Sequence, residues 1–448
     1  MQKLKSLLFL PLVFIISCSD SKELDPIVIQ GQIINYNEDD LVLKNNFWEA
    51  IDTLKLTEGA FHESITVPNG YYYLSNGDIE FNIFLQSGKN LTVEFNTEDL
   101  QSLSISGSGA NENKYLMSKS KMRALFDYRT LDEGSFLHKA DSLKAQHIAH
   151  LENTNNVTKE FYSLEKSSIL INHAIRLSQF EGRKRGMTNN PDFKVSDNYP
   201  NVYENIDLND PQLMKTYRYK DLLGNYVSSQ VIHSEGYSDS LDFFVLFQEY
   251  LSKSKLAPEI KDRLGLDNAE FGFTYSNNKK KYFETYLEFV QNESYKQRFT
   301  NSYNALQSKK GMPSPSFNFK GYDGQWYSLE HFRNKYVYID LWASWCSPCI
   351  VQIPHLKRLE EKFKDKIDFV SIAWSDDYES WKNMISAKKM DGFQLFAEDT
   401  ASEFFSFYDV QSSGIPRFIL LDKAGNIIDS NAQQPSYPDL EEQLNRLE

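Results

Sequence analysis

The sequence predicts a multidomain α+β protein with a small all-β domain, an all-helical domain and an α/β domain, in that order. Three observations lead to this prediction. Short alternating apolar runs occupy residues 27–109, apolar residues at helical spacing dominate residues 110–309, and strand-like and helix-like segments alternate over residues 313–448. With 448 residues, of which 41% are hydrophobic, the chain is long enough for two or three domains and their cores.

The N-terminus has the features of an export signal. Two lysines precede an apolar run from Leu7 to Ile16, which is too short to span a bilayer comfortably and is typical of a signal peptide over residues 1–17. Cys18 follows directly, after a small residue, which resembles a bacterial lipoprotein signal. The resemblance implies cleavage before Cys18, lipidation of its thiol, and a tether over residues 18–26. The alternative is an unlipidated free cysteine after ordinary secretion, an unusual choice in an oxidising compartment.

Residues 27–109 predict a small β sandwich or barrel, because short runs of strand-forming residues alternate with Asn- and Gly-rich turn signals. This part resembles the β domain at the same position in many Bacteroidetes-type lipoproteins. The predicted strands include Ile27–Ile29, Leu41–Leu43, Ile51–Leu56, Ile79–Leu85 and Leu91–Phe95.

A Ser-Gly segment at residues 106–109 predicts a hinge, and the apolar period then becomes helical through residues 110–309. We find no catalytic constellation in this helical domain. His147 and His150 have the i, i+3 spacing that suits a metal, but no third ligand is near them in the sequence. We therefore predict ordinary helix-surface histidines and no metal site.

The last domain begins after a short Pro/Ser linker near residue 313. A hairpin is predicted around residues 317–327, followed by a buried strand at 336–343 that leads into a helix. A strand at 369–374, two further helices, a hairpin over 417–431 and a C-terminal helix complete an α/β order.

The most informative segment runs from Trp345 to Cys349, directly after the apolar run 336–343. Two cysteines separated by two residues at a strand-to-helix junction can interconvert between dithiol and disulfide. The thiol of Cys346 lies where helix N-terminal N–H groups and the macrodipole favour a thiolate. The alternative is half of a zinc site, which needs further ligands, and the only other cysteine is Cys18. The spacing therefore favours redox chemistry without a metal or other cofactor.

A second segment, Gly414 to Pro416, precedes a strand-like run at residues 418–422. X-Pro bonds are the only peptide bonds that adopt cis at low cost. A proline just before a strand can place the backbone of Ile415 against the thiol pair, as a docking edge for an extended peptide. Ile-Pro alone is an ordinary loop dipeptide, but beside the Cys-x-x-Cys unit it strengthens the prediction.

From about Pro313 to Glu448 the chain resembles the thioredoxin superfamily. The branch is that of membrane-tethered, extracytoplasmic thiol-disulfide oxidoreductases related to the cytochrome-c-maturation thioredoxins. The matching segments are 340–349, Pro354 inside the following helix, and 414–416.

The resemblance implies a role for each motif residue. Cys346 is the attacking thiol, Cys349 the resolving thiol, and Asp340 the carboxylate buried behind the resolving cysteine. Pro416 corresponds to the cis-proline. The residues expected to dock substrate are Trp345, Pro348 and Ile415.

One position departs from the cytochrome-maturation members, which commonly carry a glutamate three residues after the second cysteine. Here that position is Gln352, which cannot accept a proton. Asp340 is then the acid expected to serve the site.

Together these features predict a cell-envelope thiol-disulfide oxidoreductase, lipid-anchored and facing the periplasm or the cell surface. The resemblance implies protein disulfides or dithiols as substrates and a membrane thiol reductant as partner. The charge balance argues against a nucleic-acid partner, since 48 basic against 62 acidic residues give −14.

Two alternatives remain open. One is a surface binding lipoprotein whose last domain is accessory. The other is a peroxiredoxin-like peroxidase, whose cysteine follows a Pro-x-x-x-Thr/Ser-x-x-Cys pattern. Ile339 and Ala343 occupy those places before Cys346, and Trp342 and Cys346 occupy them before Cys349, so neither cysteine fits.

Overall fold

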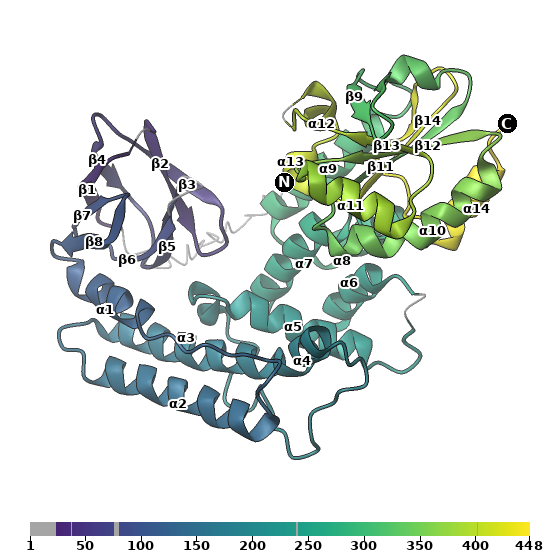
Figure 1. Ribbon diagram of the computed structural model, residues 1–448. Helices are drawn as coiled ribbons and strands as arrows, with labels where there is room; N and C mark the ends of the chain where they lie inside the picture. The colour runs from purple at the N-terminus through teal and green to yellow at the C-terminus, as the bar shows by residue number, and fades with distance from the viewer. Residues whose placement is uncertain (1–23, 37, 76–79, 239–240, 401) are drawn as a thin grey trace, which may run out of the picture. The chain divides into compact units, whose positions relative to one another are not determined.

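The structure is a computed structural model that describes residues 24–36, 38–75, 80–238, 241–400 and 402–448. It divides into two compact units (Figure 1). The first consists of residues 1–206 and 215–219, and the second of residues 207–214 and 220–448. The predicted signal peptide and Cys18 lie outside the described residues.

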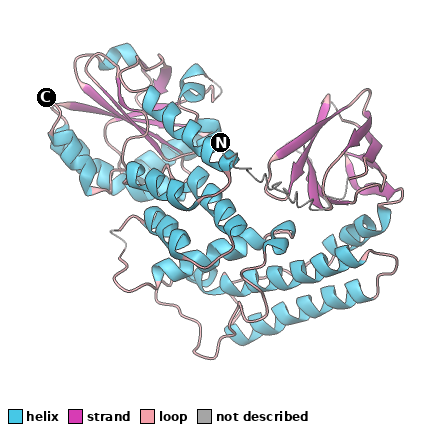
Figure 2. Ribbon diagram, turned by 180° about the vertical axis from the view of Figure 1, so that it is seen from behind, coloured by secondary structure: helices cyan, strands magenta, loops and turns pink. Residues whose placement is uncertain are grey.

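The β domain of the first unit is a sandwich of two four-stranded sheets (Figure 2). Side chains of both sheets, such as Ile29 and Val93 from one and Leu43 and Leu74 from the other, form one buried cluster. One sheet has the order β4 (Ala60–Ile65), β1 (Ile27–Ile34), β7 (Leu91–Asn96), β8 (Asp99–Ser106). The other has the order β3 (Ala50–Lys55), β2 (Asp40–Asn45), β5 (Gly70–Ser75), β6 (Glu80–Leu85).

The sequence analysis missed β4 and β8, which are the two edge strands of their sheet. An edge strand needs only part of its surface to be apolar, so its sequence is more polar than that of a central strand. The alternation of exposed and buried residues in β4 illustrates this.

Four helices complete the first unit: α1 (Ala110–Ser120), α2 (Glu133–Glu152), α3 (Lys159–Ser178) and α4 (Phe180–Thr188). The buried side chain of Asn113 on α1 joins the helices to the sandwich, because it bonds to both backbone groups of Phe84 on β6. Its Oδ1 accepts from the Phe84 N–H at 2.8 Å, and its Nδ2 donates to the Phe84 carbonyl at 2.9 Å.

The other helices of this stretch are α5 (Tyr219–Ile232), α6 (Phe243–Lys253), α7 (Pro258–Gly272), α8 (Lys279–Phe289) and α9 (Glu293–Ser308), with a 3₁₀ helix at Pro211–Lys215. Apart from the first residue of α5, helices α5–α9 belong to the second unit. The helical stretch 110–309, predicted as one domain, is thus divided between the two units. Among the described residues, no helix combines the length and hydropathy needed to cross a bilayer.

The rest of the second unit is a seven-stranded mixed sheet with helices, which confirms the predicted α/β class of this part. Central strand β11 pairs in parallel with β12 and antiparallel with β14. The sheet order is β10 (Trp326–Ser328), β9 (Asn318–Gly321), β13 (Phe393–Phe396), β12 (Ile367–Ala373), β11 (Tyr336–Trp342), β14 (Arg417–Leu421), β15 (Ile427–Asp429).

Two apolar clusters cover this sheet. One joins strand residues such as Tyr338 to α10 (Ser347–Phe363) and α14 (Pro438–Asn445). The other includes Trp381 of α11 (Tyr378–Lys388) and Phe404 of α12 (Glu403–Phe407). The short helix α13 (Val410–Ser413) and a 3₁₀ turn at Leu329–Phe332 are the remaining elements of this part.

Candidate active site

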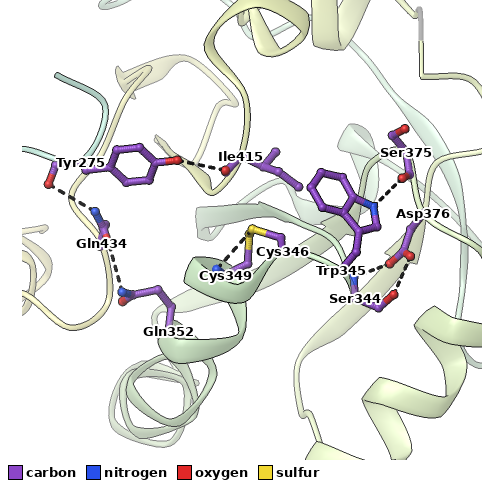
Figure 3. The surroundings of a disulfide bond; sticks show 10 residues. All are labelled: Tyr275, Ser344, Trp345, Cys346, Cys349, Gln352, Ser375, Asp376, Ile415 and Gln434. Carbon is purple, nitrogen blue, oxygen red and sulfur yellow. Dashed lines mark hydrogen bonds between the residues drawn. A yellow bond between two sulfur atoms is a disulfide. The ribbon is translucent and has the colours of Figure 1, made fainter. Parts of the chain in front are cut away.

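The two motif cysteines lie where β11 gives way to α10, as predicted, and they form a disulfide with Cα atoms 5.3 Å apart (Figure 3). Cys346 is the N-cap of α10, and its Sγ accepts the backbone N–H of Cys349 at 3.3 Å. Pro348 occupies the first turn, where its missing N–H costs nothing. When the pair is reduced, N–H groups at this helix end stabilise a negative charge on the Cys346 sulfur.

Hydrogen bonds hold the loop just before the cysteines. The backbone N–H and the hydroxyl of Ser344 both donate to Asp376, each at 2.6 Å. The indole Nε1 of Trp345 donates to the carbonyl of Ser375 at 2.8 Å, although 59% of this residue is exposed. Trp345 therefore presents an apolar surface beside a disulfide whose two cysteines are each only 3% exposed.

The Ile415–Pro416 peptide bond is cis, as the resemblance to the thioredoxin superfamily implied. Because β14 pairs with β11, this loop comes to the end of β11 from which the cysteines follow, and Ile415 lies in the surroundings of the disulfide (Figure 3). The two segments are about 70 residues apart in the sequence.

Asp340 lies in the middle of β11 and is 5% exposed. By strand alternation it shares a sheet face with Tyr338, which packs against α10. Burial raises the pKa of its carboxyl to about 8. The charge of Glu360 adds to this rise, and a long hydrogen bond of 3.5 Å from the Ser371 hydroxyl opposes it.

Glu360 of α10 is a group that the sequence analysis missed. It is 8% exposed, and burial, with a contribution from Asp391, raises its pKa to about 7. It lines a pocket of about 330 Å³ together with Asp391 and Gly392. A glutamate on an amphipathic helix gives no sequence signal of burial, so only the packing reveals it.

Gln352 is 7% exposed and takes part in a neutral hydrogen-bond chain. Its Nε2 donates to Oε1 of Gln434 at 2.9 Å, and its Oε1 accepts the backbone N–H of Ser436 at 2.9 Å. The Nε2 of Gln434 donates in turn to the backbone carbonyl of Tyr275 at 3.3 Å. Tyr275, also missed by the sequence analysis, donates its hydroxyl to the carbonyl of Ile415 at 3.2 Å (Figure 3).

Within the described part of the chain, no group of three or more His, Cys, Asp or Glu side chains could hold a metal ion. The remaining predicted site residue, Cys18, is outside that part. The structure thus brings Trp345 and Ile415 into the surroundings of the Cys346–Cys349 disulfide (Figure 3). Pro348 lies between the two cysteines in the first turn of α10, and cis-Pro416 directly follows Ile415.

The comparison with known proteins agrees with this geometry. Residues 309–444 match the Redoxin family, and residues 27–113 match a domain of unknown function, DUF4369. Thiol-disulfide oxidoreductase ResA of Bacillus thuringiensis subsp. konkukian is 27% identical over 138 residues, which are 31% of this chain and 78% of the relative. Thioredoxin-like protein YneN of Bacillus subtilis is 29% identical over 130 residues, 29% of this chain and 62% of the relative.

Two solved structures are also similar to this part. The thioredoxin domain of a thiol-disulfide oxidoreductase from Bacteroides vulgatus is 27% identical, with 30% of this chain and 98% of that chain covered and a TM-score of 0.28. A thiol-disulfide oxidoreductase from Bacteroides fragilis is 28% identical, with 29% and 98% covered and a TM-score of 0.27.

The Redoxin match and the curated relatives assign the C-terminal part of the chain to the thioredoxin superfamily, as predicted. This C-terminal part is a thioredoxin-like domain of the thiol-disulfide oxidoreductase type.

Proposed function

We propose that this chain works in the cell envelope and reduces disulfides of other proteins through Cys346 and Cys349. The observation that carries the proposal is the closed Cys346–Cys349 pair at the start of α10, in the surroundings of which the cis-proline loop lies. The relatives whose names state thiol-disulfide oxidoreductase activity support the same chemistry.

The proposed reaction has two exchange steps. The thiolate of Cys346 attacks one sulfur of the substrate disulfide, forms a mixed disulfide and releases the other sulfur as a thiolate. Cys349 then attacks the sulfur of Cys346, which releases the second substrate thiol and closes the Cys346–Cys349 disulfide. Two electrons pass to the substrate, so a thiol reductant at the membrane must then return the pair to its dithiol form.

Asp340 is proposed to take the proton of Cys349 in the second step. Its pKa of about 8 is close to the usual pKa of a thiol, about 8.5, so proton transfer between the two groups costs little. Its place on the sheet face that α10 covers supports this role.

Substrate is proposed to dock in extended form on the backbone of Ile415, with Trp345 and Pro348 beside it. The exposed indole of Trp345 offers apolar contact surface at the mouth of the site.

We also propose that Cys18 carries a lipid anchor. Cys18→Ala in the full chain should abolish incorporation of a labelled fatty acid and release the protein from membranes. A variant that stays membrane-bound without label would contradict the anchor.

A trapping experiment tests the reaction. Cys349→Ser, mixed with a disulfide-containing peptide, should accumulate a mixed disulfide at Cys346 that mass spectrometry detects. Cys346→Ser should form none, and the unaltered protein should reduce the peptide with turnover when dithiothreitol is supplied. If Cys346→Ser accumulates the adduct instead, the two cysteines have the opposite roles, and if the unaltered protein leaves the peptide oxidised, the proposed function is wrong.

A further inference from the structure

Tyr275 comes from outside the Redoxin match and reaches the predicted docking loop. It lies in the short connection between α7 and α8, within the second unit, and its hydroxyl donates to the carbonyl oxygen of Ile415 at 3.2 Å. That carbonyl belongs to the backbone on which we propose that an extended substrate pairs.

Several hydrogen bonds and one ring contact hold the segment that contains Tyr275 in place. Its backbone carbonyl accepts from the hydroxyl of Tyr437 at 2.8 Å and from Nε2 of Gln434 at 3.3 Å. Two residues further, the carbonyl of Asn277 accepts from Nε2 of Gln433 at 2.9 Å. The Tyr275 ring stacks on Phe244 of α6 with centroids 5.7 Å apart. A contact held by this many bonds is part of the fold of the unit rather than a chance approach of a loop.

The Tyr275 contact and substrate docking use the same acceptor. A peptide strand that adds to a backbone edge donates its own N–H to a carbonyl of that edge. Because a backbone carbonyl has two lone pairs, the competition concerns a substrate N–H that approaches on the side that the Tyr275 hydroxyl occupies, and there the substrate strand must displace the hydroxyl. The low exposure of Cys346, 3%, means that a bulky substrate also needs space at the sulfur.

We propose that Tyr275 is a specificity-determining residue that competes with substrate for the Ile415 carbonyl. Substrates with an extended segment next to their disulfide replace the tyrosine hydroxyl with a backbone N–H and gain access. Small disulfides that make no backbone pairing react without displacing it. This inference rests on the proposed function, because it assumes that Ile415 is where substrate docks.

Tyr275→Phe removes the competing donor while the ring stays. We expect it to raise kcat/KM for a disulfide-containing peptide by roughly five- to tenfold, the value of one hydrogen bond, and to leave the rate with hydroxyethyl disulfide nearly unchanged. Tyr286→Phe is the matched control, since its hydroxyl donates to the carbonyl of Tyr295 instead, and it should change neither rate.

A binding measurement separates this inference from the proposed function. A peptide of the same sequence with serine in place of cysteine should bind Tyr275→Phe more tightly than the unaltered protein in calorimetry, whether or not any disulfide is reduced. Equal or weaker binding, or equal peptide kinetics, overturns the competition. Absence of reduction in the unaltered protein counts against the proposed function alone.

A second and independent observation lies in the first unit, where a cavity of about 490 Å³ opens between β5, β6 and helices α1–α3. Its wall includes the aromatic rings of Tyr71 and Tyr73. Four cationic side chains and two carboxylates line it: Lys119, Arg123, Lys144, Arg176, Glu80 and Glu165. The excess of positive charge contrasts with a chain whose net charge is −14.

The charges of this cavity are not balanced within it. Glu165 is fully buried and already satisfied, because it pairs with Lys119 and accepts the hydroxyls of Tyr71 at 2.5 Å and Tyr115 at 3.2 Å. Within the described part of the chain, Arg123 and Arg176 form no ion pair.

The pKa values of two histidines on the cavity wall, His147 and His173, are lowered by burial and by these positive charges. Burial lowers the pKa of His147, and the charges of Lys119 and Arg176 lower it further. Burial and then Lys144 lower the pKa of His173 to about 4. His147, predicted as a surface residue, is half-buried, and its ring lies 3.1 Å from the carbonyl of Met122. Lys144 pairs with Asp141 at 2.8 Å, so among the described residues Arg176 is the half-buried cation of this wall without a carboxylate partner; its guanidinium lies over the ring of Phe126, 5.0 Å from the centroid. Such a cation is costly to bury and favours an added anion.

We infer that this cavity binds a small organic anion, a carboxylate or a phosphate, with Arg176 as its main charge partner and the tyrosine rings against its apolar part. Benzoate and phenyl phosphate are suitable probes for calorimetry on the full chain, with benzyl alcohol as the neutral comparison. The two anionic probes distinguish the carboxylate from the phosphate.

We expect millimolar binding of at least one anionic probe at low ionic strength, weakened roughly tenfold in Arg176→Gln, as for the loss of one charge-assisted hydrogen bond. Arg123→Gln, at a more exposed position, should weaken it less, and Lys159→Gln, an exposed lysine that does not line the cavity, should leave it unchanged. Binding of neither anion, binding of benzyl alcohol equal to that of benzoate, or full affinity in Arg176→Gln overturns the assignment.

Discussion

Two buried polar side chains of the C-terminal α/β part, Asp340 on β11 and Gln352 on α10, have almost the same exposure and opposite surroundings. Asp340 is 5% exposed and Gln352 is 7% exposed. Asp340 shares its sheet face with the apolar cluster of Tyr338, feels the charge of Glu360, and accepts a long hydrogen bond of 3.5 Å from the Ser371 hydroxyl. The amide of Gln352 both donates and accepts at 2.9 Å, so its buried polar atoms are satisfied.

The same degree of burial has different consequences for a carboxyl and for an amide. Burial penalises a charge and not a satisfied amide, so the pKa of the Asp340 carboxyl rises to about 8, close to the usual pKa of a thiol, and its ionised fraction can accept a proton in the step proposed above. The amide of Gln352 exchanges nothing and instead links α10, through Gln434, to the segment that carries Tyr275. The surroundings of Asp340 thus fit the proton transfer proposed for it, and those of Gln352 fit a positioning role.

The largest expected effect is on stability and tests whether Asp340 is a buried acid. Because its folded pKa is raised from 3.8 to about 8, the folded state binds the proton more tightly than the unfolded state, and stability falls as pH rises between these values. Asp340→Asn removes this loss, so the variant should be more stable than the parent at alkaline pH by up to about 5 kcal/mol.

Denaturant unfolding at pH 4, 7 and 9 measures this gain, which should vanish near pH 4. Asp365→Asn, at an exposed position, is the control and should leave the pH dependence unchanged. A constant difference between Asp340→Asn and the parent across this range would mean that Asp340 titrates normally.

The second effect is kinetic. Asp340→Asn should slow the release of substrate from the mixed disulfide by roughly 10²-fold, at the low end of general-base effects, while the first attack by Cys346 keeps its rate. Stopped-flow measurement with a disulfide peptide separates the two steps. Resolution at the parent rate across neutral pH would assign the proton transfer to solvent.

The third effect concerns the hydrogen bonds of the Gln352 side chain. Gln352→Ala leaves Oε1 of Gln434 and the N–H of Ser436 without their partner, which should cost about 1–3 kcal/mol of unfolding free energy. Gln352→Glu should instead move the pH optimum of disulfide reduction upward, because a second carboxylate near Cys349 raises the pKa of that thiol. An unchanged pH profile in Gln352→Glu would show that this side is too distant from the sulfur to affect it.

The smallest expected effect distinguishes the two thiols themselves. In the reduced protein Cys346 should react with iodoacetamide at neutral pH about tenfold faster than Cys349, which corresponds to a thiol pKa about one unit lower at the helix N-terminus. Brief labelling followed by mass spectrometry gives the ratio. Preferential labelling of Cys349 would reverse the proposed roles.

The sequence by itself determined the C-terminal fold class and the centre of the site. A strand, two cysteines spaced by two residues and a helix form one local unit, so the positions of Cys346 and Cys349 at the start of α10 follow from the order of residues. The proline that follows Ile415 is also indicated locally, by an Ile-Pro dipeptide just before a strand, and the structure has this bond in cis. In both cases the chemistry lies within a few residues of the chain, where spacing and turn propensity are informative.

The tertiary structure alone decided what surrounds that centre. Tyr275 meets Ile415 across 140 residues of sequence, and Gln352 meets Gln434 across 82. Apolar periodicity predicts that a helix buries one face, but not which element covers it, so it indicated neither the burial of Glu360 nor the division of the helices between two units. Such contacts depend on how separate elements pack against one another, and no local sequence pattern determines that packing.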